Sequence, residues 1–301
     1  MSLIVTGSIG IDTIEAPTGH ADNVLGGSAI YFAAAASFFD EVRLVGAVGD
    51  DFPDAFMDTF HDFKVDLDGL EKREGSKTFR WTGKYKPTMN DRETLSVELN
   101  VLGEELPPVP DHYRDSRYVF LANTHPAGQM ALLEQFPDHQ LAVADTMDLW
   151  IETERKALTD LLGRIDGLVL NDSEALLLTD EENIVRAADR IAEMGPTFVV
   201  VKKGEHGALL RHQDGYAVFG AYPARNVIDP TGAGDSFAGG MMGYLSATGG
   251  DSSLENLRKA IGWGTVVASF NLESFSLERL RSLDRQQLED RFEDFAEMTR
   301  C

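Results

Sequence analysis

Short apolar runs recur along the chain and alternate with segments of helical periodicity. The apolar runs consist largely of Val, Leu, Ile, Phe, Tyr and Ala and lie at 3–5, 42–45, 118–121, 141–144, 167–170 and 198–201. Between several of them, apolar residues return every three or four positions, which predicts amphipathic helices at 28–39, 130–135, 150–162 and 181–194. Buried strands that alternate with helices predict parallel βαβ units. The expected fold class is therefore α/β, a three-layer α/β/α sandwich with a mostly parallel central sheet.

The C-terminal third of the chain continues this pattern with helices alone. Helical periodicity is expected at 236–246, 254–270 and 277–299. No stretch resembles a flexible linker, so residues 1–301 are predicted to form a single domain. In doubly wound α/β domains the ligand site lies at the carboxyl ends of the strands. Catalytic and ligand-binding residues are therefore expected in the segments that follow the apolar runs.

Two segments, about 12–25 and 76–100, alternate polar and apolar residues instead. Such alternation predicts half-exposed antiparallel strands. Both segments are inserted between core units, so together they are expected to form a small β-sheet that projects over the strand ends. Trp81 and Tyr85 would be large apolar groups for a lone hairpin to expose. They favour a lid, or a contact between two copies of the chain, over surface hairpins without a role.

Composition and charge narrow the class of partner. The chain has 301 residues, of which 43% are hydrophobic, and its 27 Lys and Arg against 50 Asp and Glu give a formal net charge of −23. Nucleic acids and anionic membrane surfaces both require clustered cations, so neither is the expected partner. The only cysteine is Cys301, which excludes an internal disulfide. No targeting segment or long apolar run is evident, and we expect a cytoplasmic protein that binds a small molecule.

The most informative segment is 226–240, which contains Asp-Pro-Thr-Gly-Ala-Gly-Asp-Ser-Phe. A turn at Gly232, Ala233 and Gly234 leads directly into a helix, so several backbone N–H groups are expected to be unpaired and to point the same way. With the helix dipole they would form an anion hole for a phosphoryl group. Asp235 stands beside this hole, where a carboxylate can accept the proton of an attacking hydroxyl. The segment therefore predicts phosphoryl transfer.

This segment closely resembles the C-terminal signature of the ribokinase family, the PfkB-type carbohydrate kinases. Members of the family transfer the γ-phosphoryl group of ATP to an alcohol. The resemblance extends over nearly the whole chain and includes further matching segments, at 7–12, 26–29, 45–51, 171–174 and 201–208. It implies an ATP-dependent kinase in which Asp235 is the base and Gly232–Gly234 form the anion hole.

The resemblance also implies where the acceptor binds. Asp12 matches a position that accepts hydrogen bonds from substrate hydroxyls. Gly26 and Gly27 match the N-terminal signature, and the absence of a Cβ would let backbone amides approach a polyol. Tyr31 stands where sugar kinases commonly have Asn. Its ring either stacks on a bulky acceptor, such as a nucleobase, or faces the core from its helix.

For the nucleotide, the resemblance implies a set of residues at two strand ends. Asn171 and Glu174 match the Asn-x-x-Glu motif that is associated with Mg²⁺ and phosphate, and Glu174 would hold Mg²⁺ through water. Gly204 and Gly207 match the strand-turn that lies along the nucleotide. Lys202 either offsets phosphate charge or is a solvated side chain at a strand end.

A monovalent-cation site is a further expectation from the family. Asp229 and Thr231 stand where ribokinase-like enzymes hold K⁺ with carbonyls and a carboxylate. The other half of such a site would lie near Ser269–Ser276, where the match is loose. A bound cation would order the turn that forms the anion hole.

Departures from the family pattern affect the choice of acceptor. Met147 replaces the Asn of an Asp-x-Asn stretch that begins at Asp145. An aromatic and a thioether near the acceptor offer less polar matching than a free sugar requires. Arg92, in the lid segment, is a candidate clamp for a phosphate already on the substrate.

We therefore predict an ATP- and Mg²⁺-dependent kinase for a sugar or sugar-like alcohol. The alternative within the same fold is a nucleoside kinase of adenosine or cytidine type. A more remote alternative is a non-catalytic relative that senses a sugar or nucleotide. A homodimer through the lid is a further expectation, because related enzymes often associate there.

Overall fold

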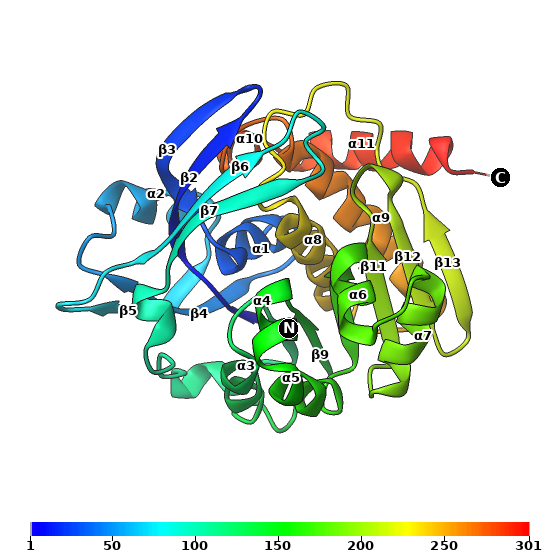
Figure 1. The fold of residues 1–301 in the computed structure, drawn as a ribbon, viewed down its shortest axis with the longest axis horizontal. Helices are drawn as coiled ribbons and strands as arrows, with labels where there is room; N and C mark the ends of the chain where they lie inside the picture. Colours follow the sequence, from blue (N-terminus) through cyan, green and yellow to red (C-terminus); the bar gives the residue numbers. More distant parts are fainter. Residues whose placement is uncertain (1, 301) are drawn as a thin grey trace.

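The computed structural model describes residues 2–300, so Cys301 lies outside the described residues. Its main sheet contains β1 (Leu3–Thr6), β4 (Val42–Gly49), β5 (Asp66–Arg73), β8 (Tyr118–Leu121), β9 (Leu141–Asp145), β10 (Gly167–Asn171), β11 (Phe198–Lys202), β12 (Ala208–His212) and β13 (Gly215–Phe219). These strands form a nine-stranded sheet in the order β13-β12-β11-β10-β9-β8-β1-β4-β5 (Figure 1). All six predicted apolar runs are strands of this sheet, as expected for segments that are buried on both faces.

The strands from β11 to β5 pair in parallel, whereas β12 and β13 add an antiparallel hairpin at one edge. The mostly parallel sheet is thus confirmed. The hairpin and the edge strand β5 were not predicted. β5 mixes charged and apolar residues without a continuous apolar run, whereas β12 and β13 contain short apolar runs, Ala-Leu-Leu and Tyr-Ala-Val-Phe, that were not assigned to strands.

Helices cover both faces of the sheet. They are α1 (Ser28–Ala36), α2 (Asp54–Asp62), α3 (Pro126–Leu133), α4 (Asp148–Thr153), α5 (Arg155–Leu162), α6 (Asp172–Thr179), α7 (Ile184–Glu193), α8 (Ala233–Ala247), α9 (Leu254–Asn271), α10 (Glu278–Arg281) and α11 (Arg285–Met298). One apolar core joins α1, α8 and α9 to the sheet, and a second core joins α3, α5 and α7 to its other face. Leu3 and Val5 of β1 belong to the first core and Ile4 to the second. The three-layer prediction is confirmed.

Two predicted helices are divided in the structure. The segment 150–162 forms parts of α4 and α5, because the backbone leaves the helical conformation at Glu154, with φ −127° and ψ 29°. The segment 277–299 forms α10 and α11. The second of these begins with a capping box in which Asp284 and Gln287 bond each other's backbone N–H groups, and such a box marks a helix start.

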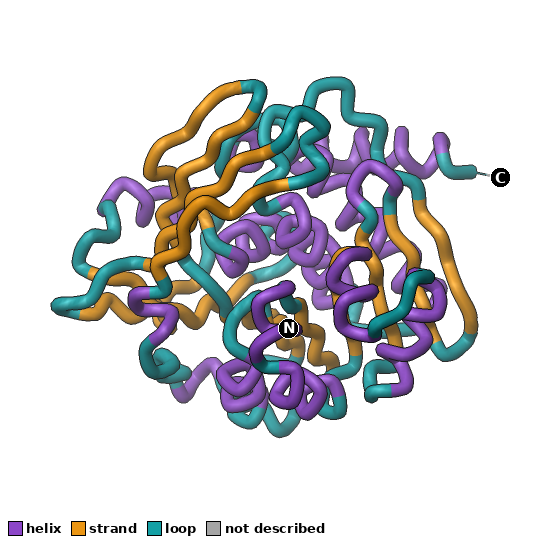
Figure 2. The backbone as a smooth tube through the Cα atoms, in the orientation of Figure 1, coloured by secondary structure: helices purple, strands orange, loops and turns teal. Residues whose placement is uncertain are grey.

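The two alternating segments form a second sheet that lies beside the main one (Figure 2). It consists of β2 (Gly10–Ala16), β3 (Gly19–Gly26), β6 (Phe79–Tyr85) and β7 (Arg92–Glu98), in the order β3-β2-β6-β7. Each hairpin is antiparallel, but β2 and β6 pair in parallel. The expectation of antiparallel strands throughout is therefore wrong at this central pair, where strands from two separate insertions meet. We call this sheet the lid sheet.

Across residues 2–300, no helix combines the length and the apolar character needed to cross a bilayer.

Candidate active site

The ends of three neighbouring strands bring polar side chains to one edge of the main sheet. β9 ends at Asp145, β10 at Asn171 and β11 at Lys202. Asn171 and Lys202 are direct partners, and both strand pairs are parallel. Parallel strands end at the same edge of a sheet, and open α/β sheets bind their ligands beyond that edge. These residues therefore lie where the fold class places a ligand.

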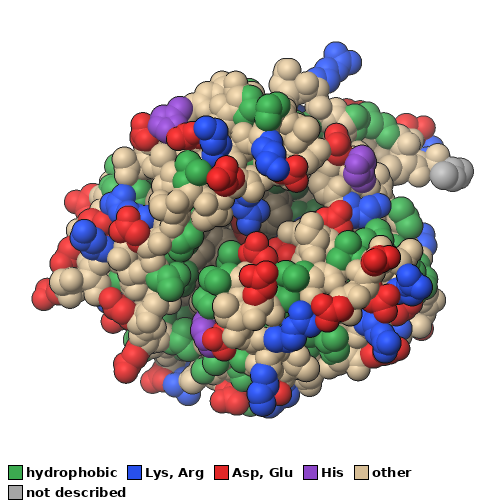
Figure 3. All heavy atoms as spheres, in the orientation of Figure 1, with side chains coloured by type: hydrophobic (Ala, Val, Ile, Leu, Met, Phe, Trp, Pro, Cys, Tyr) green, Lys and Arg blue, Asp and Glu red, His purple; other side chains and the backbone are tan. Residues whose placement is uncertain are grey.

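A hollow in the surface lies in front of this edge. Figure 3 shows it between the lid sheet and the helices α4 and α6, beside the start of α8, whose place is seen in Figure 1. The strand ends, the lid sheet and the start of α8 thus surround one cleft.

The turn before α8 presents backbone N–H groups at the start of that helix. Gly232 is the N-cap residue, with φ 74° and ψ 0°, a left-handed conformation that glycine adopts without steric cost. The N–H of Ala233 donates to the carbonyl of Pro230 at 3.1 Å, whereas no backbone carbonyl among residues 2–300 accepts from the N–H of Gly232 or Gly234. Two of the three amides predicted as anion donors are thus without a backbone partner there, and the third is used within the turn.

The Lys202 side chain lies at this helix start. A Cβ atom placed on Gly234 would lie 2.9 Å from Lys202 Nζ. The positive charge of Lys202 lowers the pKa values of Asp145, Glu174 and Asp235, against the effect of their burial. Lys202 therefore points toward the turn, which favours its interpretation as a phosphate-facing cation over that of a solvated strand end.

Asp235 occupies the first turn of α8. Burial raises its pKa, and the charges of Lys202 and Arg92 act in the opposite direction. Burial also raises the pKa of Asp145 well above its ordinary value, with the charge of Asp235 as a further cause. Asp145 is buried, and its Oδ1 has no hydrogen-bond partner among the described residues. The helix start thus combines unpaired amides, a cation and two neighbouring acids.

Asp12 approaches the same place from the lid sheet. It lies on β2 and is 4% exposed. Burial, followed by the charges of Asp229 and Asp235, raises its pKa to about 8. Asp235 is thus one of the charges that act on Asp12, although 223 positions separate the two residues in the sequence.

The double glycine at 26–27 has a packing reason in this structure. A Cβ atom on Gly26 would overlap the carboxylate of Asp12, and one on Gly27 would overlap the backbone carbonyl of Ser8. Gly27 also has φ 105°, which other residues rarely adopt. The glycines therefore let β3 and α1 approach β2 closely. The contact of their amides with an acceptor stays a prediction.

Tyr31 lies beneath the turn before α8. It is 1% exposed, and a Cβ atom on Gly232 would overlap three carbons of its ring. Its hydroxyl is buried without a partner among the described residues. Burial raises its pKa well above the ordinary value, and the charges of Asp229 and Asp12 raise it further. A ring buried in this way has no face for an acceptor, so the interpretation in which Tyr31 faces the core replaces the stacking interpretation.

Asn171 and Glu174 form the capping box of α6. Glu174 N–H donates to Asn171 Oδ1, and Asn171 N–H donates to Glu174 Oε2, both at 2.8 Å. Glu174 is 8% exposed, and burial raises its pKa. No group of three or more His, Cys, Asp or Glu residues within 2–300 could hold a metal ion alone. The carboxylate of Glu174 is a ligand type that Mg²⁺ accepts beside several waters and substrate phosphates, so its chemistry is compatible with the predicted role, which stays a prediction.

The loop after β11 contains the two glycines predicted to lie along the nucleotide. Gly204 has φ 53° and Gly207 has φ 82°, and a Cβ atom on Gly207 would overlap the carbonyl of Phe219. The lid sheet reaches this loop, because Asn90 Nδ2 donates to Glu205 Oε1 at 2.8 Å. The turn between β6 and β7 therefore reaches the loop that is predicted to lie along the nucleotide.

Asp229 and Thr231 stabilise the turn before α8 from behind. Asp229 is fully buried, and its Oδ1 accepts the Thr231 N–H at 2.9 Å. Its Oδ2 has no partner among the described residues. Asn271 Nδ2 donates to the Thr231 carbonyl at 2.7 Å, so the end of α9 fixes the same turn. Ile228 N–H donates to the Leu272 carbonyl at 2.8 Å, which brings the segment after α9 alongside.

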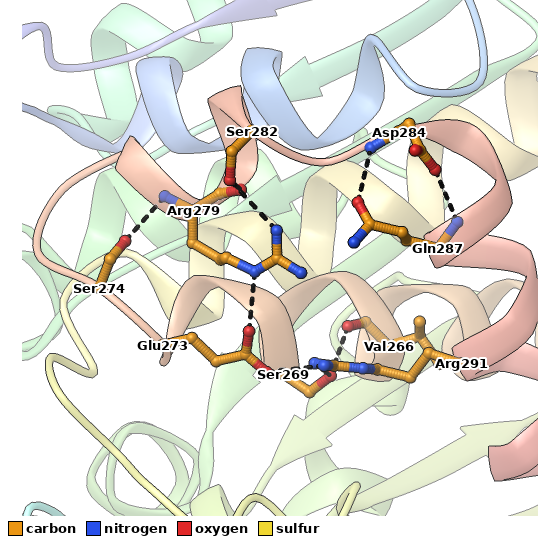
Figure 4. A network of polar contacts seen from close by, with 9 residues as sticks. All are labelled: Val266, Ser269, Glu273, Ser274, Arg279, Ser282, Asp284, Gln287 and Arg291. Carbon is orange, nitrogen blue, oxygen red and sulfur yellow. Dashed lines mark hydrogen bonds and ion pairs between the residues drawn. The ribbon is translucent and has the colours of Figure 1, made fainter.

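The segment after α9 is itself held by an ionic network (Figure 4). Glu273 accepts from Arg279 Nε at 2.8 Å and from Arg291 at 2.7 Å, and Arg291 also donates to Ser269 Oγ at 3.1 Å. Both arginines lie over the ring of Phe270. The predicted second half of the cation site, Ser269–Ser276, is therefore a well-tethered segment.

Residues not singled out from the sequence also face the strand ends. Asn123 follows β8, its Oδ1 accepts from Trp150 Nε1 at 3.0 Å, and its Nδ2 lies 3.1 Å from Met147 Sδ. Ser28 Oγ of α1 lies 3.4 Å from the Asn123 carbonyl. Asn123 thus connects the loop after β9 to the start of α1. Its position directly after an apolar strand is the signal that the sequence offered.

Comparison with known proteins identifies the family. Residues 3–280 match the family model described as pfkB family carbohydrate kinase. The chain belongs to this family. The cytidine kinase of Thermococcus kodakarensis is 30% identical over 254 residues, which cover 81% of this chain and 88% of that kinase. This pfkB member is therefore an ATP-dependent kinase that phosphorylates a sugar or a nucleoside.

Solved structures share the fold of this pfkB kinase. The nucleoside kinase of Burkholderia thailandensis in complex with inosine has a TM-score of 0.79 at 20% identity, covering 97% of this chain and 98% of that one. The fructokinase of Vibrio cholerae with fructose, ADP and calcium bound has a TM-score of 0.80 at 20% identity, with coverage of 97% and 98%. These likenesses concern the fold, in which kinases bind nucleotide and a divalent metal ion.

Proposed function

We propose that Asp235 is the general base of this kinase and that the amides of Gly232 and Gly234 stabilise the transferred phosphoryl group. In the reaction, the acceptor oxygen forms a bond to the γ-phosphorus of ATP while the bond from that phosphorus to the β–γ bridging oxygen breaks, and the hydroxyl proton moves to Asp235. Charge develops on the transferred group, so preorganised donors count most. The observation that best supports this proposal is the position of Asp235 in the first turn of α8, beside Lys202 and the unpaired amides.

Asp12 is proposed to orient the acceptor. Its buried carboxyl group lies on the lid sheet and is electrostatically coupled to Asp235. A hydroxyl bonded to Asp12 would therefore hold a neighbouring hydroxyl of the same molecule near the base. Burial raises the pKa of Asp12 to about 8, and a protonated carboxyl group can donate to one acceptor oxygen as well as accept from another. Closure of the lid sheet would exclude water from the transfer.

The nucleotide is proposed to lie along the loop that contains Gly204 and Gly207, with its phosphates toward Lys202. Asn171 and Glu174 are proposed to hold Mg²⁺, with Glu174 acting through bound water. When bound, the ion would neutralise charge on the phosphates. Lys202 supplies a cation beside the anion-binding turn, which offsets the charge of the surrounding acids.

A monovalent cation is proposed beside Asp229 and Thr231. The buried Asp229 Oδ2 has no partner within residues 2–300, and a buried unpaired carboxylate oxygen is costly. A K⁺ ion bound there would satisfy this oxygen and stiffen the turn before α8. Burial raises the pKa of Asp229, so a bound cation would also favour its ionised form.

Two classes of acceptor are candidates for this kinase. A sugar or sugar-like alcohol is supported by the family, whereas a nucleoside is supported by the likeness to the cytidine kinase over 81% of the chain. Met147, held against Asn123 near the strand ends, lessens the number of polar partners for a free sugar. A non-catalytic sensor is the least supported, because the acid and the unpaired amides of α8 are all present.

The lid sheet is proposed to join two copies of the chain. β7 is an edge strand, and Leu95, Val97 and Leu99 are 46%, 46% and 41% exposed. Apolar side chains on an open edge favour pairing with another strand. Sedimentation of the wild type and of Val97→Glu tests this association: a monomeric wild type would contradict it.

A cytoplasmic location also belongs to the proposal and is supported by the use of ATP. Cell fractionation that finds the protein outside the cytoplasmic fraction would contradict it.

Asp235→Asn tests the central proposal. Loss of a general base should lower kcat by about 10²- to 10⁴-fold, while binding of ATP, measured by calorimetry, stays close to that of the wild type. Asp54→Asn is the matched control, because Asp54 also occupies the first turn of a helix, α2. Turnover by Asp235→Asn at the wild-type rate would remove Asp235 from the mechanism.

A further inference from the structure

Trp81 is a large aromatic residue on the lid sheet that the proposed mechanism does not use. In the parallel pair of β2 and β6 it is the direct partner of Asp12. Paired residues of neighbouring strands project from the same face of a sheet. Tyr85, four residues further along β6, projects from that face too, and its hydroxyl accepts from Thr231 Oγ1 at 3.0 Å. Trp81 is therefore on the face of the lid sheet that carries Asp12 and meets the anion-binding turn.

The indole of Trp81 lies flat across this face. A Cβ atom on Gly83 would overlap three carbons of its six-membered ring. Its Nε1 donates to Thr94 Oγ1 on β7 at 3.3 Å, which fixes the rotation of the ring. One indole face thus covers the backbone at Gly83, and Gly83 is buried while Trp81 remains partly exposed. The other face of the indole is turned away from the sheet.

The spacing of residues along β6 gives the distance between the Trp81 ring, which covers Gly83, and the turn before α8. A strand rises about 3.3 Å per residue, so Gly83 lies about 7 Å along β6 from Tyr85, which contacts the turn at Thr231. A free pentose or hexose held between Asp12 and Asp235 has no flat group to place on the indole. A nucleoside has one, because its planar base extends from the sugar.

We propose that Trp81 is the stacking platform for the base of a nucleoside acceptor, held flat by Gly83 and Thr94. This inference rests on the proposed function, since it assumes that the sugar hydroxyl of the acceptor lies between Asp12 and Asp235. Stacking is tolerant of base identity because every base has a π face. The platform therefore selects nucleosides over free sugars and leaves the choice among bases to other contacts.

Kinetics of two variants test the platform. Trp81→Ala removes the ring, and Gly83→Ala keeps the ring but displaces it with a methyl group. Loss of one base-stacking contact should raise KM for the preferred nucleoside by about 10- to 100-fold in both, with a smaller change in kcat. Trp81→Phe should keep most of the affinity. Turnover of cytidine, adenosine, inosine, ribose and fructose should be compared by measuring the release of ADP.

Gly163→Ala is the control for the glycine substitution. Gly163 has φ −70°, and a Cβ atom there would make only ordinary contacts, at 3.6 Å and beyond. Its kinetics should match those of the wild type. A Gly83→Ala enzyme that matches the wild type as well would overturn the proposal, and so would turnover of ribose or fructose with no turnover of any nucleoside.

Binding without turnover gives an independent measurement. The chain has 3 Trp residues, and a base stacked on Trp81 should quench its fluorescence. Titration of wild type with the preferred nucleoside in the absence of ATP should show quenching, and Trp81→Phe should show none while it still binds by calorimetry. The same titration on Asp235→Asn separates the two proposals. Full activity of Asp235→Asn defeats the assigned base alone, whereas undiminished quenching in Trp81→Phe defeats the platform alone.

Discussion

Gly232→Ala should both destabilise the protein and disable the turn before α8. Gly232 has φ 74°, and a left-handed conformation costs a residue with a Cβ about 1–2 kcal/mol. The new methyl group would also overlap the ring of Tyr31, which is 1% exposed and has no room to turn aside. Overpacking of a buried site costs about 1–3 kcal/mol. The expected total loss in the free energy of unfolding is therefore about 2–5 kcal/mol.

A double-mutant cycle separates these two causes. Tyr31→Ala removes the whole ring, including the Cγ that lies nearest to the new methyl group, so it abolishes the overlap but leaves the unfavourable φ at position 232. Gly232→Ala should then cost only about 1–2 kcal/mol in the Tyr31→Ala background. The difference between the two backgrounds, about 1–3 kcal/mol, is the interaction energy of ring and methyl. Such a value lies within the range found for residues in direct contact.

Thermal unfolding and turnover measure both effects. For a chain of this size the melting temperature should fall by roughly 2–4 °C for each kcal/mol lost. Gly163→Ala, at φ −70° and with only ordinary van der Waals contacts for the new methyl group, should leave the melting temperature almost unchanged. Turnover by Gly232→Ala should fall with little change in the affinity for acceptor. Equal costs of Gly232→Ala in the two backgrounds would refute the packing of Tyr31 under the turn.

Three further predictions follow from the charges at the site. The pKa of Asp12 is about 8 in the folded protein against an ordinary value of 3.8. Between about pH 4 and pH 8 the folded protein therefore retains a proton that the unfolded chain releases, so the free energy of unfolding falls as the pH rises. Asp12→Asn should flatten this fall when stability is measured by urea unfolding, and parallel curves for wild type and variant would contradict the prediction. Lys202→Gln removes a charge that lowers the pKa of Asp235, so the acidic limb of the kcat–pH profile should move to higher pH. The control variant Lys203→Gln should leave this limb in place. An unmoved limb in Lys202→Gln would count against Asp235 as the base. Turnover should be higher in K⁺ than in choline, and Asp229→Asn should lose this difference; a wild type indifferent to K⁺ would exclude the cation site.

The sequence was sufficient for the core of the fold and for the start of α8. Strands buried on both faces have continuous apolar runs, such as Phe198–Val201, and these are recognisable without any partner. The turn at Gly232 was recognisable because closely spaced glycines directly before a run of small apolar residues are typical of a turn that leads into a helix. By contrast, β12 and β13 form an antiparallel edge hairpin whose apolar runs are only three and four residues long, and no helical segment separates them to mark a βαβ unit. Periodicity could not distinguish them from surface loops.

Relations between distant segments were the part that no local pattern contained. Tyr31 was placed correctly on a helix, but only the packing against Gly232 shows that its ring is enclosed. Likewise the alternation around Trp81 predicted a strand, whereas its parallel pairing with β2 depends on how two insertions meet. The use of the Ala233 N–H within its own turn depends on the backbone conformation of residues 230–233. Such features depend on tertiary contacts, and those are not encoded in residue spacing.

The hairpin of β6 and β7 is fastened at two points, by Tyr85 to Thr231 and by Asn90 to Glu205. Each of these neutral or singly charged hydrogen bonds contributes about 1 kcal/mol net. Breaking both contacts would thus require about 2 kcal/mol, so roughly one molecule in thirty would lack both of them at any moment, while the pairing of β6 with β2 still holds the hairpin in the lid sheet. Thermal fluctuations should therefore break and re-form these two hydrogen bonds many times during the lifetime of the folded chain. Ligands therefore need no separate trigger to enter, and products need none to leave.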